Sequence, residues 1–251
     1  MREITRREVV LGGALTVLHA TCACGVAHAQ GSVAGCWIPQ DQASGYIARA
    51  TDARVYANGS ERMEPRSGNA ALDRALAQAL AKIARTFEVL PAFTYLDDGN
   101  QPNAYATAEA MLDRTDGTVM FGLGFLKMLL ARPERPDASI VAVCAHEFGH
   151  ILSYKNGMIR QLAPTRGAPF RGEQFADFMA GYFAGTRKLE HADYPAVVFA
   201  TTQRYFGGGD HGSGEQRGAA VQAGFLAGYQ RRMSIGDAQQ TGFNYAMAQS
   251  L

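Results

Sequence analysis

The residues that most constrain the fold lie in one apolar segment, residues 138–154, which follows Pro136 and has the spacing of a single continuous helix. The pattern His-Glu-x-x-His stands inside it, at positions 146–150. Residues four apart lie on one face of a helix, so both imidazoles can reach a single Zn²⁺. Glu147 projects from the neighbouring position, where it can hold a water molecule and take its proton without ligating the metal.

The pattern alone is short, because three fixed residues in five also occur by chance on ordinary helices with a polar solvent face. Its surroundings favour the metal site. The six positions before His146 are all apolar or small, as in a buried helix. Two histidines and a glutamate would be costly near a core without a partner, so we expect one to be present.

A tetrahedral catalytic zinc takes three protein ligands and leaves its fourth position open. Glu173 offers the third ligand, 23 residues beyond His150 and at the start of the next predicted helix. Asp177 follows it by four residues on the same helix face, where it can orient a ligating histidine from behind. The alternative for Glu173 is a glutamate near a helix N-terminus that is stabilised by the helix dipole.

Periodicity along the rest of the chain predicts an α+β fold in which helices dominate. A helix capped by Asn69 is expected to run to about Leu90, before Pro91. Three short strands are expected next, in a small mixed or antiparallel sheet, at residues 92–96, 103–107 and 117–121. Further helices are expected at residues 125–130, 174–185, 194–205 and 215–231.

Residues 1–29 are typical of an export signal. Arg6 and Arg7 precede an apolar run at residues 9–18, and Ala27-His28-Ala29 suits a signal peptidase that cleaves after about Ala29. The paired arginines resemble a Tat signal, although valine follows where that motif prefers phenylalanine, so Sec export stays open. A retained membrane anchor is the alternative, but the run is shorter than the ~20 residues of a span. We expect a periplasmic or secreted protein.

The composition of the chain after the signal bears on its structure and its partners. Residues 30–67 carry Gly, Ser and Pro without a sustained period, which predicts a loop-rich lead-in with one short strand. Loss of the signal would remove three arginines and two glutamates and leave 21 basic and 21 acidic residues. Such a neutral balance without charged runs argues against a nucleic-acid partner. After residue 30 no apolar run is long enough to span a membrane.

Two cysteines, Cys36 and Cys144, would remain after signal removal. Cys144 lies two residues before His146, where a small buried thiol packing in the core is the favoured interpretation. A disulfide between the two is the alternative in an oxidising compartment, because sequence alone does not fix a pairing.

The order His-Glu-x-x-His, then Glu-x-x-Ala-Asp at the start of a helix rich in Ala, Gly and Phe, resembles the gluzincin metallopeptidases. The similarity is closest to the HtpX-like and CaaX-prenyl-endopeptidase family and to the bacterial neutral zinc metallopeptidases. It spans roughly Leu72 to Tyr229, with strong motifs in four short stretches. The resemblance implies a zincin-like fold for residues 68–251 and one Zn²⁺ per chain.

Two further roles are implied by this resemblance alone. Asn103, Ala104, Tyr105 and Ala106 resemble an edge strand that pairs with the substrate backbone. His211 and Arg217 resemble a late His-x-x-x-x-x-Arg element, in which the histidine donates to the oxyanion and the arginine braces the site by pairing with an acidic residue such as Asp177. The alternatives are a polar residue in the glycine-rich loop 207–214 for His211 and a solvated helix residue for Arg217.

Two features depart from the family. Its membrane-bound members carry several spanning helices, which this chain lacks after residue 30, so no membrane-embedded substrate is implied. Gly212 stands where proline often follows the late histidine, which weakens the placement of His211.

The sequence therefore predicts a zinc endopeptidase with a peptide or protein substrate, in which Glu147 takes the proton of a water activated by the metal. Two alternatives remain. One is a zinc-binding protein that captures peptides without turnover, although a structural zinc needs four ligands and no adjacent base. The other is a metallohydrolase acting on cell-wall peptide amides.

Overall fold

The structure is a computed structural model that describes residues 37–38, 50–55, 67, 69–96, 98, 102–110, 114–164 and 169–250. The predicted export signal and most of the lead-in lie outside the described residues. The fold is α+β and mostly helical, as predicted.

A small mixed sheet contains five strands in the order β1-β4-β5-β3-β2. The strands are β1 (Trp37–Ile38), β2 (Ala50–Val55), β3 (Ala92–Leu96), β4 (Ala104–Thr107) and β5 (Thr118–Gly122). β3 and β5 run parallel, and β4 is antiparallel to β5. The three central strands agree with the sequence prediction, and the sheet is mixed.

The lead-in contributes two strands, where the sequence predicted one. β1 pairs with β4 in parallel, and β2 pairs with β3 in the antiparallel sense. The two additions lie at opposite edges of the sheet. Single-strand patterns this short carry little periodicity, which is why β1 was not predicted.

Helices make up most of the described chain. They are α2 (Ala70–Phe87), α3 (Leu123–Leu130), α4 (Pro136–Lys155), α5 (Ile159–Leu162), α6 (Phe170–Glu190), α7 (Val197–Tyr205), η1 (Gly209–His211), α8 (Gly214–Tyr229) and α9 (Ile235–Met247). The first begins where Asn69 accepts hydrogen bonds from two backbone amides. It ends at Phe87, three residues before the expected end, and is followed by Glu88 in the left-handed region.

Two α-helices, α5 and α9, and the short 3-10 helix η1 were not predicted. α9 buries Ala238, Gly242 and Ala246, which are four residues apart but too small to give an apolar stripe. α5 is a single turn of four residues. α5 is too short to show a helical period, and the buried positions of α9 are alanine and glycine, so neither gives a strong periodic signal.

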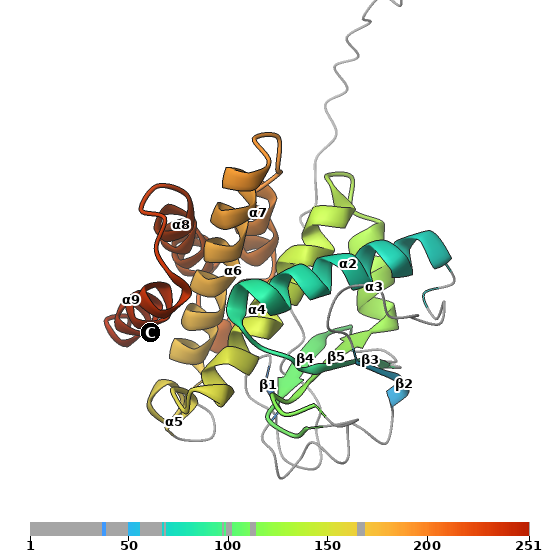
Figure 1. Cartoon of the computed structure of the whole chain (residues 1–251), viewed down its shortest axis with the longest axis horizontal. Coiled ribbons are helices and arrows are strands. Elements are labelled where there is room, and N and C mark those ends of the chain that lie inside the picture. The colour runs from blue at the N-terminus through green and yellow to red at the C-terminus, as the bar shows by residue number, and fades with distance from the viewer. Residues whose placement is uncertain are drawn as a thin grey trace, which may run out of the picture.

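α4 and α6 lie at the centre of the molecule (Figure 1). The sheet, α2 and α3 lie on one side of them, α8 and α9 lie on the other, and α7 packs against α4, α6 and α8. α4 is buried over most of its length, from Ala138 to Ser153. Its polar residues therefore face neighbouring elements of the protein, and not solvent.

Close approach of α4 and α6 requires a glycine at position 149. A Cβ atom there would lie 2.8 Å from the Ala176 Cα and 3.1 Å from the Ala176 carbonyl oxygen, both backbone atoms of α6. Gly149→Ala should therefore lower the free energy of unfolding by about 1–3 kcal/mol, because the two helices must separate. Urea denaturation measures this loss.

Gly236→Ala is the matched control, because a Cβ on that residue of α9 meets only the Ser234 hydroxyl, at 4.0 Å. It should leave stability unchanged or raise it by up to about 1 kcal/mol. Equal stabilities for the two variants would contradict the close contact between α4 and α6.

Cys144 is a free thiol, fully buried on α4, in agreement with the favoured interpretation. Burial raises its pKa, so it is held as a neutral core residue. Cys36 lies outside the described residues.

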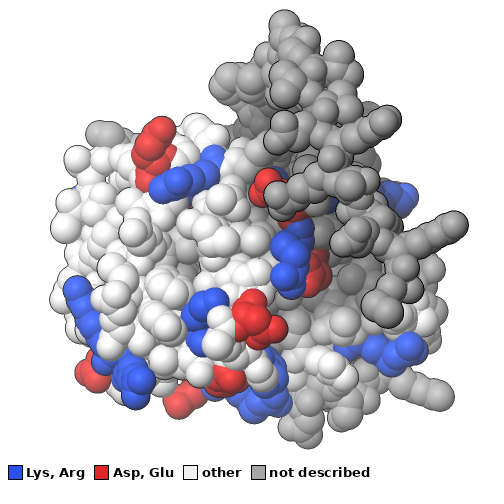
Figure 2. All heavy atoms as spheres, turned by 90° about the horizontal axis from the view of Figure 1, so that it is seen from above, with Lys and Arg blue, Asp and Glu red and all other residues white. Residues whose placement is uncertain are grey.

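On the face drawn in Figure 2, Lys and Arg are interspersed with Asp and Glu over the described residues, without a patch of one sign. This pattern agrees with the near-zero charge balance of the sequence. A search of the described helices finds none that is long and apolar enough to cross a membrane.

Candidate metal centre

The side chains of the three predicted metal ligands lie together in the structure. His146 and His150 lie one turn apart on α4, and Glu173 comes from the first turn of α6. The two Nε2 atoms are 3.2 Å apart. Glu173 places Oε2 3.2 Å from His146 Nε2 and Oε1 3.5 Å from His150 Nε2. All three side chains are buried, and together they could hold a metal ion.

These separations match the edges of a coordination tetrahedron. Bonds of ~2.0–2.1 Å to nitrogen and oxygen imply ligand atoms about 3.3–3.4 Å apart. The separations of 3.2, 3.2 and 3.5 Å lie on both sides of that value, with His146 facing Oε2 and His150 facing Oε1 of Glu173. Imidazole nitrogen and carboxylate oxygen are also a donor set that suits a borderline divalent cation. The three residues could therefore hold one metal ion.

Electrostatics favour ionised Glu173 at this place. Burial alone would raise its pKa, but the neighbouring His211, His150 and His146 hold the pKa well below the usual range. Burial lowers the pKa of His150, which therefore stays neutral and able to ligate. An anion facing two imidazole nitrogens is the arrangement that a cation would complete.

Asp177 lies behind His146, one turn after Glu173. Its Oδ1 is 2.7 Å from His146 Nδ1, so the imidazole can donate there and present Nε2 toward Glu173. Burial by itself lowers the pKa of His146, but Asp177 and Glu173 outweigh it and raise the pKa to about 10. Asp177 thus orients the ring, in the place expected from the sequence.

Arg217 on α8 completes this arrangement. Its Nε donates to Asp177 Oδ2 at 2.7 Å and its Nη2 donates to Asp177 Oδ1 at 2.9 Å. Arg217 is 1% exposed, so this bidentate pair is held away from solvent, which excludes the solvated alternative. Burial would raise the pKa of Asp177, but Arg217 and His146 keep it below its usual value.

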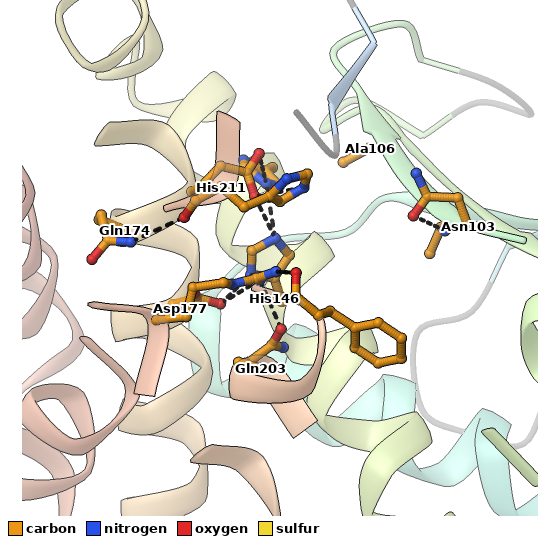
Figure 3. Close-up of polar contacts among 12 residues, drawn as sticks. Asn103, Ala106, His146, Gln174, Asp177, Gln203 and His211 are labelled. Carbon is orange, nitrogen blue, oxygen red and sulfur yellow. Dashed lines mark hydrogen bonds and ion pairs between the residues drawn. The ribbon is translucent and has the colours of Figure 1, made fainter. Parts of the chain in front are cut away.

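Two glutamines that the sequence analysis did not identify also join this network. Gln203 on α7 accepts from Arg217 Nη2 at 2.7 Å. Gln174 on α6 donates to the His211 carbonyl oxygen at 3.3 Å (Figure 3). Gln203 is distant from the ligands in sequence, and Gln174 follows Glu173 but carries no pattern that marks a contact with His211, so neither was identified from the sequence.

His211 lies in η1, next to the ligands. Its Nε2 is 3.5 Å from Glu173 Oε2, and its side chain is buried. Burial lowers its pKa to about 4, so at neutral pH the ring is uncharged and can donate a hydrogen bond from one nitrogen. The loop that carries it is held in place by its contact with α6, and so His211 is not the freely placed polar residue of the alternative interpretation.

Glu147 shares the burial of the ligands but is not one of them. Its side chain is 1% exposed, and among the described residues its Oε2 atom has no hydrogen-bond partner. Burial raises the pKa of Glu147 to about 8. A carboxyl group with this pKa can accept and return a proton near neutral pH.

β4 carries the predicted substrate-binding residues, and it lies on the sheet side of His146 (Figure 3). The Gly122 amide donates to the Asn103 carbonyl oxygen. In an antiparallel pair, alternate residues direct their amide and carbonyl groups toward the partner strand. The backbone groups of Ala104 and Ala106 therefore point away from β5. The Ala104 amide donates to Asn103 Oδ1 at 2.9 Å, and Tyr105 is partly buried.

The expectation that β4 forms an open edge is wrong for its second half. Trp37 pairs with Ala106, and Ile38 pairs with Thr107, so β1 covers the outer side there. The Tyr154 hydroxyl also donates to the Ala106 carbonyl oxygen at 3.3 Å. Among the described residues, this pairing begins at Ala106 and leaves the earlier part of β4 outside it.

Comparison of the chain with protein-family models, with curated proteins and with solved structures gives no match. The interpretation of the centre therefore depends on its own geometry.

Proposed function

We propose that the chain is an exported zinc endopeptidase with a zincin-like fold, related to the gluzincins that its motifs resemble. The observation that carries the proposal is the convergence of His146, His150 and Glu173, with ligand atoms 3.2–3.5 Å apart, on α4 and α6, the helices of the buried Glu147 carboxyl group and of Asp177. A structural zinc takes four protein ligands, so three ligands and an adjacent base favour catalysis.

When bound, zinc would polarise the scissile carbonyl and lower the pKa of a water molecule toward neutrality. Glu147 takes the proton from the attacking water and returns it to the leaving amine. His211, on the other side of Glu173, donates to the oxygen that gains negative charge. Asp177 and Arg217 act only through His146, whose ring they orient.

The substrate backbone would add to β4 beside Asn103, Ala104 and Tyr105. Main-chain hydrogen bonds bind an extended peptide with little demand on its sequence. Pairing farther along, at Ala106, would require β1 to give way. We therefore expect an endopeptidase of broad specificity.

Digestion of casein by the purified chain tests the proposal. Cleavage should stop on addition of a chelator and return with zinc. A parallel incubation with peptidoglycan distinguishes the alternative substrate. Intact casein beside cut peptidoglycan would overturn the protease assignment, and zinc uptake without cleavage of either would favour a binding protein.

Zinc binding should release at least about one proton per chain at pH 7.5. His146 has a pKa of about 10 without a metal, so it is protonated at that pH and must lose a proton to ligate. Affinity for zinc should accordingly rise with pH up to about 10. Calorimetric titration in two buffers with different ionisation enthalpies measures the number of protons released.

Asp177→Asn identifies the source of the proton. Because Asp177 is the main group that raises the pKa of His146, the variant should release fewer protons at pH 7.5. A wild-type release well below one proton, or an unchanged release in the variant, would contradict the protonated state of His146.

A further inference from the structure

Gln203 is a buried, neutral residue that contacts two helices of the metal centre at once. It lies on α7, is 2% exposed, and directs its amide toward the network around His146 (Figure 3). Oε1 accepts from Arg217 Nη2 at 2.7 Å. Nε2 donates to the Ala142 carbonyl oxygen on α4, in a longer hydrogen bond of 3.4 Å.

Ala142 lies one turn before His146. In an α-helix the carbonyl group of residue 142 accepts from the amide of residue 146, so Gln203 binds the turn that carries the His146 backbone. The same amide group holds the guanidinium that pairs with Asp177, which in turn binds His146 Nδ1. Gln203 therefore supports His146 from two directions, through its backbone and through its ring.

The neutrality of Gln203 matters for this support. Asp177 and Arg217 already form a bidentate pair of opposite charges in a buried environment. A second carboxylate at position 203 would compete with Asp177 for the guanidinium and would add an uncompensated buried charge. An amide supplies an acceptor for the remaining Nη2 proton without either cost.

We propose that Gln203 is a positioning residue of the metal centre, which fixes Arg217 and the α4 turn so that His146 presents Nε2 to the metal. The role rests on the proposed function in that the metal is taken to be zinc. The hydrogen bonds of Gln203 go to Arg217 and to Ala142, and not to the ligating atoms of the metal centre or to β4. Gln203 therefore acts through Arg217 and Ala142.

Competition against a chromophoric chelator tests this role by a readout other than activity. Gln203→Met keeps the volume and removes both hydrogen bonds, so affinity for zinc should fall about tenfold, as for other residues behind metal ligands. Gln222→Met, an exposed residue on α8, is the matched control and should bind like the wild type. Circular dichroism and cooperative unfolding show that each variant is folded.

A double-mutant cycle separates positioning from general packing. If Gln203 acts mainly through Arg217, adding Gln203→Met to Arg217→Met should change zinc affinity only about twofold to threefold, because only the longer hydrogen bond to Ala142 is then lost. A further tenfold loss would indicate an independent packing effect and overturn the inference. Gln203→Asn serves if the Met variant does not fold. It keeps a neutral amide but is one methylene shorter, so it should not make both hydrogen bonds and should again lower affinity about tenfold.

The outcomes distinguish this inference from the proposed function. Wild-type chain that binds zinc, with folded Gln203 variants that bind equally well, would overturn the role of Gln203 and leave the metal centre standing. Zinc binding that depends on Gln203 without any hydrolysis would overturn the peptidase and leave the positioning role. A wild-type chain that binds no zinc would overturn both.

Discussion

Glu147→Gln should lower kcat for peptide hydrolysis by about 10²–10⁴-fold and leave zinc binding intact. The amide cannot take a proton from the attacking water, but it occupies the same volume as the carboxyl group. Burial raises the pKa of Glu147 to about 8, so the metal-free chain carries this group mostly neutral at pH 7. A neutral amide should therefore be tolerated by the fold.

Peptide cleavage rates and zinc content of the same preparations measure both parts of this result. Glu215→Gln makes the same chemical change at an exposed position in the first turn of α8 and should not affect either quantity. Activity within a few fold of the wild type in Glu147→Gln would show that another group is the base. Loss of zinc from the variant would show that Glu147 is a ligand.

Glu173→Gln should lower affinity for zinc more than about 100-fold, and activity with it. Changes behind a metal ligand already cost 10–100-fold, and here a ligating charge itself is removed. The carboxylate is fully buried beside three imidazoles, which hold its pKa well below the usual range, so no other anion replaces it there. Chelator competition gives the affinity directly.

Glu190→Gln is the matched control for this variant, because it lies on the same helix, α6, with a side chain that is 54% exposed. Its surface ion pairs contribute little, so zinc affinity and activity should stay at wild-type values. Unchanged zinc affinity in Glu173→Gln would remove Glu173 from the metal centre and return it to the helix-terminal role considered from the sequence.

The central part of the site could be predicted because it depends on local spacing. His146, Glu147 and His150 lie within one and a half turns of one helix, so the helix alone fixes which of them share a face. Glu173 and Asp177 are related in the same way on α6. That Glu173 reaches the two histidines across 23 residues was inferred from the metal's need for a third ligand and from the resemblance, and the structure brings the two helices together.

The remainder depends on tertiary contacts that leave no periodic trace. Gln203 and Gln174 reach the centre from α7 and α6 because of how the helices pack, and glutamine has no preference that marks such a position. The pairing of β1 with β4 joins residues about 70 positions apart in the chain. Only a three-dimensional structure shows that this edge is partly covered.

The most direct test of the centre is X-ray absorption at the zinc edge of the zinc-loaded full chain. The account predicts one zinc per chain, bound by two imidazole nitrogens and oxygen donors at ~2.0–2.1 Å, with no sulfur. A sulfur neighbour at ~2.3 Å would place Cys144 or another thiol on the metal and contradict the assigned ligands. A folded chain that takes up no zinc would contradict the metal centre altogether.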